Sequence, residues 1–202
     1  MKITAVCIGA SQKLAGKSYR SGIDKRAVGG PVMIDSLGLV GDKVCNKKHH
    51  GGPDQAILIE GERTLDWWRA ELGRDLPPGS FGENLVIAGL ENGDVAVGDR
   101  FSFGDIVLEA TAPRMPCATL AAWMGDPQIV KRFAQVGRPG IYARVIAGGF
   151  VEAGMDVALL PYAGERIPIP RMMAAYGRVS NEERARMLAA PIAERLRNRL
   201  EI

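Results

Sequence analysis

Cys117 is the residue whose surroundings in this sequence best suit chemistry. It stands in TAPRMPCATLAAWMG, where Pro113 and Pro116 exclude a helix upstream and the following residues have helix-forming composition as far as Gly125. A cysteine at a helix start, with Arg114 close by, is expected to have a lowered thiol pKa, and a thiolate is both a nucleophile and a soft metal ligand. A small buried filler is the alternative, because most free cysteines behave that way.

A second chemical feature is the basic loop in CNKKHHGGPDQAILIE, residues 45–60. The adjacent His49 and His50 point to opposite sides of an extended chain, so this pair alone does not form a zinc site. Gly51 and Gly52 expose backbone N–H groups beside the cations, which suits an anionic ligand such as a phosphate. Taken by itself, the loop is better explained as a solvated turn.

The other polar motifs are less specific. The turn PGSFGENL carries Glu83 and Asn84, whose side chains more often cap a turn than contact a substrate. No G-x-G sequence occurs, which excludes a dinucleotide fingerprint and a kinase-type glycine loop. Of the remaining cysteines, Cys7 lies within an apolar run and is expected in the core, whereas Cys45 is interpreted as an incidental loop thiol.

A predominantly β scaffold has to position these residues. Short apolar runs alternate with Gly, Pro and Asp over the first 160 residues, a pattern typical of a barrel or a strongly curved mixed sheet. The runs that predict strands are ITAVCI, PVMI, QAILIE, ENLVIAG, DRFSF, IVLEATA, YARVIAG and DVALL. Residues 62–73 and 126–137 instead repeat apolar side chains at helical spacing. We therefore expect a mainly β, barrel-like fold with two helices packed on the sheet.

The sequence changes character after Leu160. Residues 161–170, PYAGERIPIP, contain three prolines and are interpreted as a linker. Ser180 and Glu183 then form a capping box, and apolar residues recur at every fourth position from Ile192. This pattern predicts a small C-terminal helical unit with a narrow apolar stripe.

The chain is thereby divided into a β domain, residues 1–160, and a linker with a helical extension, residues 161–202. Isolated helices under about 12–15 residues are marginal in water, so the apolar stripe is expected to be buried against the chain's own sheet or against a second copy in a homodimer. We expect residues 1–160 to fold without the extension.

Charge and composition narrow the classes of function. Residues 1–170 hold 19 Lys and Arg against 19 Asp and Glu, whereas residues 171–202 hold seven Arg against four Glu. The balanced charge of the first 170 residues argues against a nucleic-acid-binding surface across the β domain. The excess of arginine in the extension could instead steer an acidic partner protein. The arginines concerned are Arg184, Arg186, Arg195, Arg197 and Arg199. No stretch approaches the roughly 20 apolar residues of a membrane helix, and three widely spaced cysteines suit the cytoplasm.

Four segments, in order, resemble the MOSC domain, the module also found at the C-terminus of molybdenum-cofactor sulfurases. They are LGLVGDKVCNKKHHGGPDQAI, FGENL, VGDRFSFGDIVLEATAPRMPC and GIYARVI. The likeness covers about residues 1–160 and is greatest to stand-alone bacterial members associated with resistance to hydroxylaminopurine, which also carry a helical extension. Four motifs in the right order are a far more specific signal than any one of them.

The resemblance implies a β-barrel-like fold that binds the molybdenum cofactor, a molybdopterin, in a basic cleft, with Cys117 as molybdenum ligand or as sulfur carrier. His49 lies outside the shared element. Carried over by position, the cofactor-binding residues are Lys25, His50, Gly51, Gly52, Glu83, Asn84, Arg114 and Arg144.

Three functions of different class stay open. The first is an oxidoreductase that reduces small N-hydroxylated compounds; because the sequence offers no iron–sulfur, flavin or nicotinamide motif, its electrons would come from a separate reductase partner. The second is a sulfur carrier, in which Cys117 bears a persulfide. The third is a cofactor-binding module without catalysis.

Overall fold

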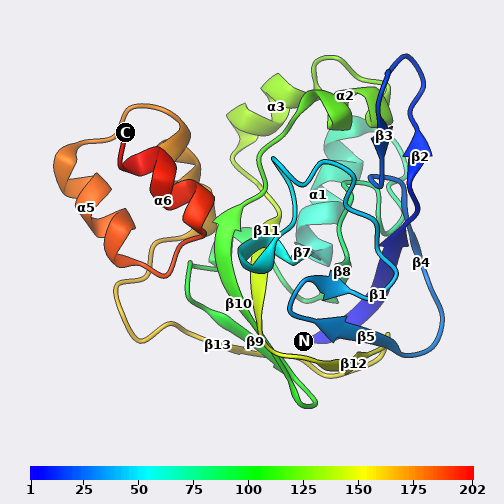
Figure 1. The fold of residues 1–202 in the computed structure, drawn as a ribbon, viewed down its shortest axis with the longest axis horizontal. Helices are drawn as coiled ribbons and strands as arrows, with labels where there is room; N and C mark the ends of the chain where they lie inside the picture. Colours follow the sequence, from blue (N-terminus) through cyan, green and yellow to red (C-terminus); the bar gives the residue numbers. More distant parts are fainter.

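The computed structural model describes residues 1–202, and an eight-stranded mixed sheet runs through it (Figure 1). The strand order is β13-β9-β10-β11-β7-β8-β1-β4. These strands are β1 (Lys2–Gly9), β4 (Lys25–Ala27), β7 (Ile57–Gly61), β8 (Leu85–Ala88), β9 (Arg100–Phe103), β10 (Ile106–Pro113), β11 (Ile141–Ala147) and β13 (Ala158–Leu160). Two small sheets add β5 (Val32–Asp35), β6 (Gly38–Leu39) and β12 (Gly149–Val151), and the hairpin of β2 (Gln12–Lys13) with β3 (Arg20–Ser21).

The prediction of a mainly β fold with helices is confirmed, and every run predicted to be a strand contributes one. Closure into a barrel is wrong, because the large sheet is open and ends at β13 and β4. Each of these edge strands has only three residues, too short for a continuous ladder between them. Curvature still brings the two ends of the sheet near each other, as a single bridge joins Lys2 to Asp156.

Three helices cover one face of the sheet: α1 (Glu62–Leu72), α2 (Ala118–Met124) and α3 (Ile129–Val136). Helix α1 connects β7 to β8, the parallel pair of the large sheet, as a β-α-β crossover requires. Under these helices the rings of Trp68 and Phe133 stack with centroids 5.1 Å apart, and Phe81 packs against both. None of the helices combines the length and apolar character needed to cross a bilayer.

The large sheet has a hydrophobic core on each face. In β8, Leu85 and Ile87 enter one core and Val86 enters the other, and all three are essentially inaccessible to solvent. Successive residues of a strand point to opposite faces, so a strand covered on both sides reads as an uninterrupted apolar run. In β1, Cys7 belongs to the helix-side core, where burial raises the pKa of its thiol to about 12. Cys7 is therefore an unreactive packing residue.

The C-terminal extension closes the second core. It consists of α4 (Ile169–Met172), the short 3-10 helix η3 (Met173–Tyr176), α5 (Asn181–Ala189) and α6 (Glu194–Leu200). Ser180 caps α5, since its hydroxyl accepts the Glu183 N–H at 3.1 Å. Helix α6 begins three residues later than Pro191, the first-turn position that the sequence suggests. The extension places its apolar side chains in the same core as the strands: Ile167, Ile169, Met172, Met187, Ile192, Leu196 and Leu200.

The proline-rich segment after Leu160 is part of the fold and not a loose tether. Ile167 O accepts the Val97 N–H at 3.0 Å, and the Ile169 N–H donates to Val95 O at 2.8 Å. Arg166 forms an ion pair of 2.6 Å with the buried carboxylate of Asp99. The boundary at residue 160 therefore separates two stretches of sequence that share one hydrophobic core.

Candidate functional site

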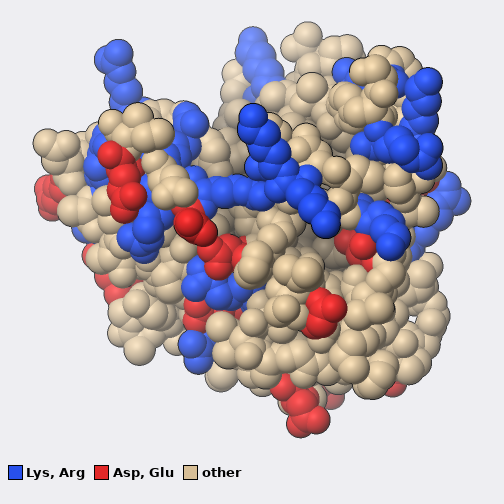
Figure 2. All heavy atoms as spheres, viewed as in Figure 1, with Lys and Arg blue, Asp and Glu red and all other residues tan.

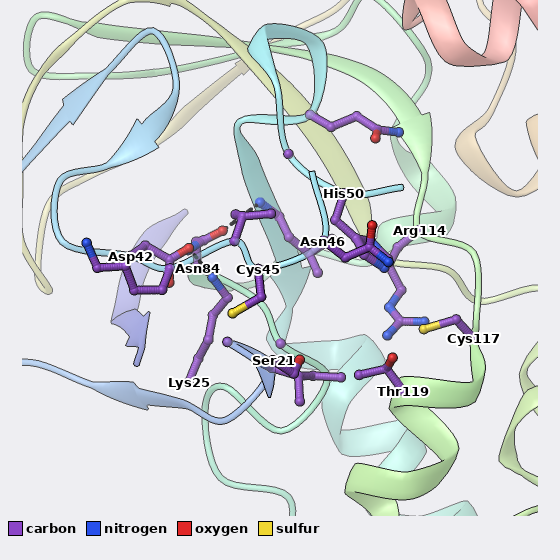
Figure 3. Close-up of a pocket in the computed structure, with 18 of the residues that line it drawn as sticks. Ser21, Lys25, Asp42, Cys45, Asn46, His50, Asn84, Arg114, Cys117 and Thr119 are labelled. Atoms are coloured by element: carbon purple, nitrogen blue, oxygen red, sulfur yellow. Dashed lines mark hydrogen bonds and ion pairs between the residues drawn. The ribbon is translucent and has the colours of Figure 1, made fainter. Parts of the chain in front are cut away.

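Most of the predicted site residues line one pocket, which lies between the basic loop, the β2–β3 hairpin and the start of α2 (Figure 3). It encloses about 750 Å³ of empty space, its open mouth included. Figure 3 shows His50 and Arg114 on the side of Cys117, and Lys25, Asp42, Asn84 and Cys45 on the opposite side. The predicted residues that line the pocket are Lys25, His50, Gly51, Asn84, Arg114 and Cys117.

Cys117 immediately precedes the first residue of α2, at the helix start that the sequence predicts, and its side chain is only partly buried. Burial by itself raises the pKa of this thiol, but three neighbours outweigh it and lower the pKa to about 6. They are the His50 imidazole as a hydrogen-bond partner, the Arg114 guanidinium, and the Leu120 amide in the first turn of the helix. At neutral pH Cys117 is accordingly a thiolate inside a pocket.

Arg114 has hydrogen-bonding capacity that the protein does not use. It is 3% exposed, and its guanidinium stacks over the Phe133 ring at 5.5 Å. One of its N–H groups donates to Met115 O at 2.8 Å, whereas Nε is buried without a partner. A buried unsatisfied donor on a permanent cation costs free energy, and an anion in the pocket would relieve that cost.

The basic loop carries His50 into the pocket and leaves His49 outside it. The two glycines that follow, Gly51 and Gly52, have φ angles of 68° and 87°, which residues with a side chain rarely adopt. They turn the chain into the 3-10 helix η1 (Pro53–Gln55). The Tyr142 hydroxyl lies 3.5 Å from Nδ1 of His50.

Lys25 lines the pocket but is already paired. Its ammonium forms an ion pair with Asp42, and the two side chains are 8% and 7% exposed. Burial lowers the pKa of Lys25, and Asp42 opposes that effect. Asn84 completes this group, since its Nδ2 donates to the same Asp42 oxygen at 3.0 Å. Arg114, not Lys25, is thus the buried cation left free for an anionic ligand.

Three residues assigned by position do not line the pocket: Gly52, Glu83 and Arg144. Glu83 is fully buried and accepts the amides of Gly79 at 2.6 Å and Phe81 at 2.9 Å, so it holds a turn. Burial raises the pKa of Glu83, while these amides lower it.

Arg144 instead holds the C-terminal extension. Its guanidinium lies 3.1 Å from an Asp54 carboxylate oxygen and 3.5 Å from Glu109, and it donates to Pro191 O at 3.2 Å and to Ile192 O at 3.1 Å. Because Arg144 follows Tyr142 by two residues, it lies about 7 Å further along the same face of β11. At that position it faces the extension.

The sequence interpretation missed the part of the pocket built by the β2–β3 hairpin. Tyr19, Arg20 and Ser21 line it, and the Tyr19 hydroxyl lies 2.9 Å from the hydroxyl of Thr119 in α2. Two-residue strands leave almost no periodic signal, so only the polar sequence SYRS marked this segment. Cys45, interpreted as an incidental thiol, also lines the pocket.

The pocket opens on a face rich in basic side chains. Figure 2 shows Lys and Arg side chains running across the middle of this face, between the C-terminal helices on the left and the β2–β3 hairpin on the right. Such a field attracts anionic ligands and raises their local concentration.

The lowered pKa of Cys117 predicts a characteristic pH profile for its alkylation by iodoacetamide. In cofactor-free protein carrying Cys45→Ser, the rate should rise with pH to half its maximum near the Cys117 pKa of about 6 and level off at higher pH, because only the thiolate reacts. His50→Ala should move the midpoint upward, whereas His49→Ala, outside the pocket, should leave it in place. A wild-type midpoint near that of an ordinary thiol would contradict this account of the site.

A comparison with known families decides what kind of domain this is. A sequence profile of the MOSC domain matches residues 46–158, more than half of the chain. The chain belongs to the MOSC domain family. MOSC domains are associated with the molybdenum cofactor. In this MOSC domain no three His, Cys, Asp or Glu side chains gather closely enough to hold a metal ion.

Individual relatives agree with this membership. YflK of Bacillus subtilis is 34% identical over 160 residues, which cover 78% of this chain and 72% of YflK. A Gibberella moniliformis protein named Reductase is 33% identical over 157 residues, 73% of this chain but only 27% of the fungal protein. The crystal structure of YiiM from Geobacillus stearothermophilus superposes with a TM-score of 0.82 at 25% identity, covering 99% of this chain and 97% of YiiM.

Proposed function

We propose that this MOSC protein holds the molybdenum cofactor in the pocket of Cys117 and reduces small N-hydroxylated compounds, such as N-hydroxylaminopurines. The observation that carries the proposal is the pairing, in one pocket, of an activated thiol with a buried arginine whose Nε lacks a partner. The pterin carries an anionic phosphate, which fits the free donors of Arg114 and the glycine turn at Gly51. A thiolate is a soft ligand suited to molybdenum.

Each protein group then has a defined task. Cys117 would ligate molybdenum, Arg114 and the Gly51 amide would hold the anionic part of the cofactor, and Lys25 with Asp42 would form a neutral wall. The bound cofactor supplies two-electron redox chemistry, which the protein's side chains cannot provide. In the overall reaction the N–O bond breaks, two electrons and two protons are taken up, and the products are the amine and water.

His50 and Tyr142 are the groups placed to handle protons. An imidazole can donate or accept a proton near neutral pH, and the Tyr142 hydroxyl lies within 3.5 Å of it. Burial raises the pKa of Tyr142, which keeps its hydroxyl protonated. We assign His50 the role of delivering a proton to the substrate side of the pocket, with Tyr142 orienting the ring.

The electrons are proposed to come from a separate reductase. The fungal relative named Reductase supports this, because the segment similar to this chain is about a quarter of a longer protein. That length leaves room for further modules in the fungal polypeptide.

The proposal predicts that Arg114→Met loses the cofactor. Protein purified from a molybdenum-replete host should contain molybdenum and pterin in equal amounts, and Arg114→Met should retain at least about tenfold less of both, because a charge-assisted contact to the anion is removed. Arg138→Met is the matched control. Arg138 also stacks on an aromatic ring, that of Trp67 at 4.8 Å, but it does not line the pocket.

Full cofactor retention by Arg114→Met, or wild-type protein without pterin, would overturn the proposed site.

A sulfur carrier is the second candidate function, and the same activated thiol favours it. It predicts wild-type protein whose Cys117 carries one additional sulfur atom by mass spectrometry, with no molybdenum bound.

A further inference from the structure

The basic loop is held at both ends by the C-terminal helix α6, although the two are about 140 residues apart in sequence. On one side of His50, the carbonyl of Lys47 accepts a hydrogen bond from Arg195 at 2.7 Å. On the other side, the Gln55 amide oxygen accepts from the same guanidinium at 2.8 Å. A single side chain therefore bridges the loop before and after His50.

A second contact between the loop and α6 also has its donor in the helix. Helix α6 starts after Ala193, which has no side-chain acceptor, and Asp54 takes that role by accepting the Glu194 N–H at 2.8 Å. The Asp54 carbonyl in turn accepts the Thr111 hydroxyl of β10 at 2.5 Å. The downstream end of the loop is therefore fixed to the sheet and to the extension, whereas on the upstream side of His50 the contact from α6 is that of Arg195 with Lys47 O.

The segment between these anchors carries the pocket's imidazole. The amides of His49 and His50 both donate to Asn46 O, at 3.3 and 3.0 Å, and these bonds set the loop's turn. Asn46, His50, Gly51 and Gln55 all line the pocket. Movement of Lys47 away from α6 would open this turn and withdraw His50 from Cys117.

We propose that Arg195 is a positioning residue, which holds the loop of residues 46–52 closed so that His50 faces Cys117. This inference deepens the proposed function, because the pocket it shapes is the one assigned to the cofactor. It gives Arg195 a role distinct from steering an acidic partner, as both acceptors lie within its own chain.

Arg197 supplies a matched comparison on the same helix. Its guanidinium donates to Leu188 O at 2.9 Å and to Ala190 O at 3.3 Å, so it braces the extension in the same chemical manner but does not touch the loop. Loss of either arginine removes two charge-assisted hydrogen bonds to the protein. Only loss of Arg195 should act on the pocket.

The test uses the full-length variants Arg195→Gln, Arg195→Lys and Arg197→Gln. Amide hydrogen exchange of the peptide containing His49 and His50 is measured first, because it needs no cofactor. In Arg195→Gln these amides should exchange about tenfold faster than in the wild type, since two charge-assisted bonds no longer oppose local opening.

The other two variants are the comparisons. Arg195→Lys can still donate to one acceptor and should restore part of the protection, whereas the amides in Arg197→Gln should exchange as in the wild type. Thermal unfolding of each variant separates local opening from global destabilisation.

Retained pterin, released by acid and measured by its fluorescence, is the second readout. It should fall in Arg195→Gln and stay near the wild-type level in Arg197→Gln. Unchanged exchange in Arg195→Gln, or equal acceleration in Arg197→Gln, would overturn the inference. Equal pterin retention by the two glutamine variants would also overturn it. Absence of pterin from the wild type would count against the proposed function alone, because the exchange readout stands without it.

Discussion

Replacing Cys117 by alanine is expected to abolish the reduction of N-hydroxylated substrates while the protein stays folded. Mutation of a residue that merely orients a metal ligand typically costs about 10–100-fold, so loss of the proposed ligand itself should cost more than about 100-fold. The side chain is only partly buried at the start of a short helix, and its removal should change the free energy of unfolding by less than about 1 kcal/mol. Activity with a chemical reductant and thermal unfolding measure the two effects.

Cys7→Ala is the matched control, and it should behave in the opposite way. Cys7 is fully buried in the helix-side core, so its truncation should cost roughly 1–3 kcal/mol of stability, with activity per folded molecule unchanged. Full activity in both variants would show that the mechanism does not depend on a thiol. Loss of activity in Cys117→Ala with full cofactor content would place Cys117 in the chemistry and not in cofactor binding.

Deleting residues 161–202 is expected to unfold the protein. The deleted segment contributes seven large apolar side chains to the core on the second face of the sheet. Each such side chain is worth about 1.5–3 kcal/mol of burial, and their sum reaches or exceeds the roughly 5–15 kcal/mol by which a domain is stable. Circular dichroism and thermal unfolding should show a chain without a cooperative transition.

Single substitutions test the contribution of the extension to the core without removing a whole segment. Leu196→Ala should cost about 2–5 kcal/mol, because Leu196 is almost completely buried within the shared core. Ile202→Ala, at a fully exposed terminal residue, should cost nothing measurable. A truncated protein that unfolds cooperatively near the wild-type temperature would show that the sheet does not need the extension.

The sequence predicts local features of this fold well and long-range ones poorly. Alternation and turn residues locate the strands, and two prolines followed by helix-forming residues locate the helix start at Cys117. These signals lie within about ten residues of each feature. An apolar stripe such as that from Ile192 shows that a face is buried, but it does not show against what, and the shared core is therefore a result of the structure.

The candidate site shows the same limit. Charge and glycine content single out the loop of His50, and the motif resemblance adds Lys25 and Arg114. His50, Lys25 and Arg114 line the pocket, whereas His49 and Gly52 of the loop do not. Arg144 has the same residue type as Arg114, yet carboxylates and the carbonyls of the extension surround it. Nothing in the local sequence distinguishes the two arginines, because the difference lies in neighbours about 30 to 90 residues away.

Five arginines of the extension, from Arg184 onward, show that basic charge in a sequence does not by itself indicate a binding surface. Arg184, Arg197 and Arg199 donate to backbone carbonyls, Arg186 pairs with Glu165, and Arg195 holds the loop. Their first task in the structure is to hold the helices in place. Steering of an acidic electron donor stays a prediction, which salt dependence of the reaction with that donor would test.

The contact between Arg195 and the loop also sets an order of events during synthesis. The ribosome makes the loop well before Arg195, because about 140 residues separate them. Until α6 has emerged, the second core is incomplete and the loop has no anchor at Lys47. Under the proposed function, cofactor loading therefore follows the synthesis of α6, and a chain that stops before Arg195 would not capture the cofactor.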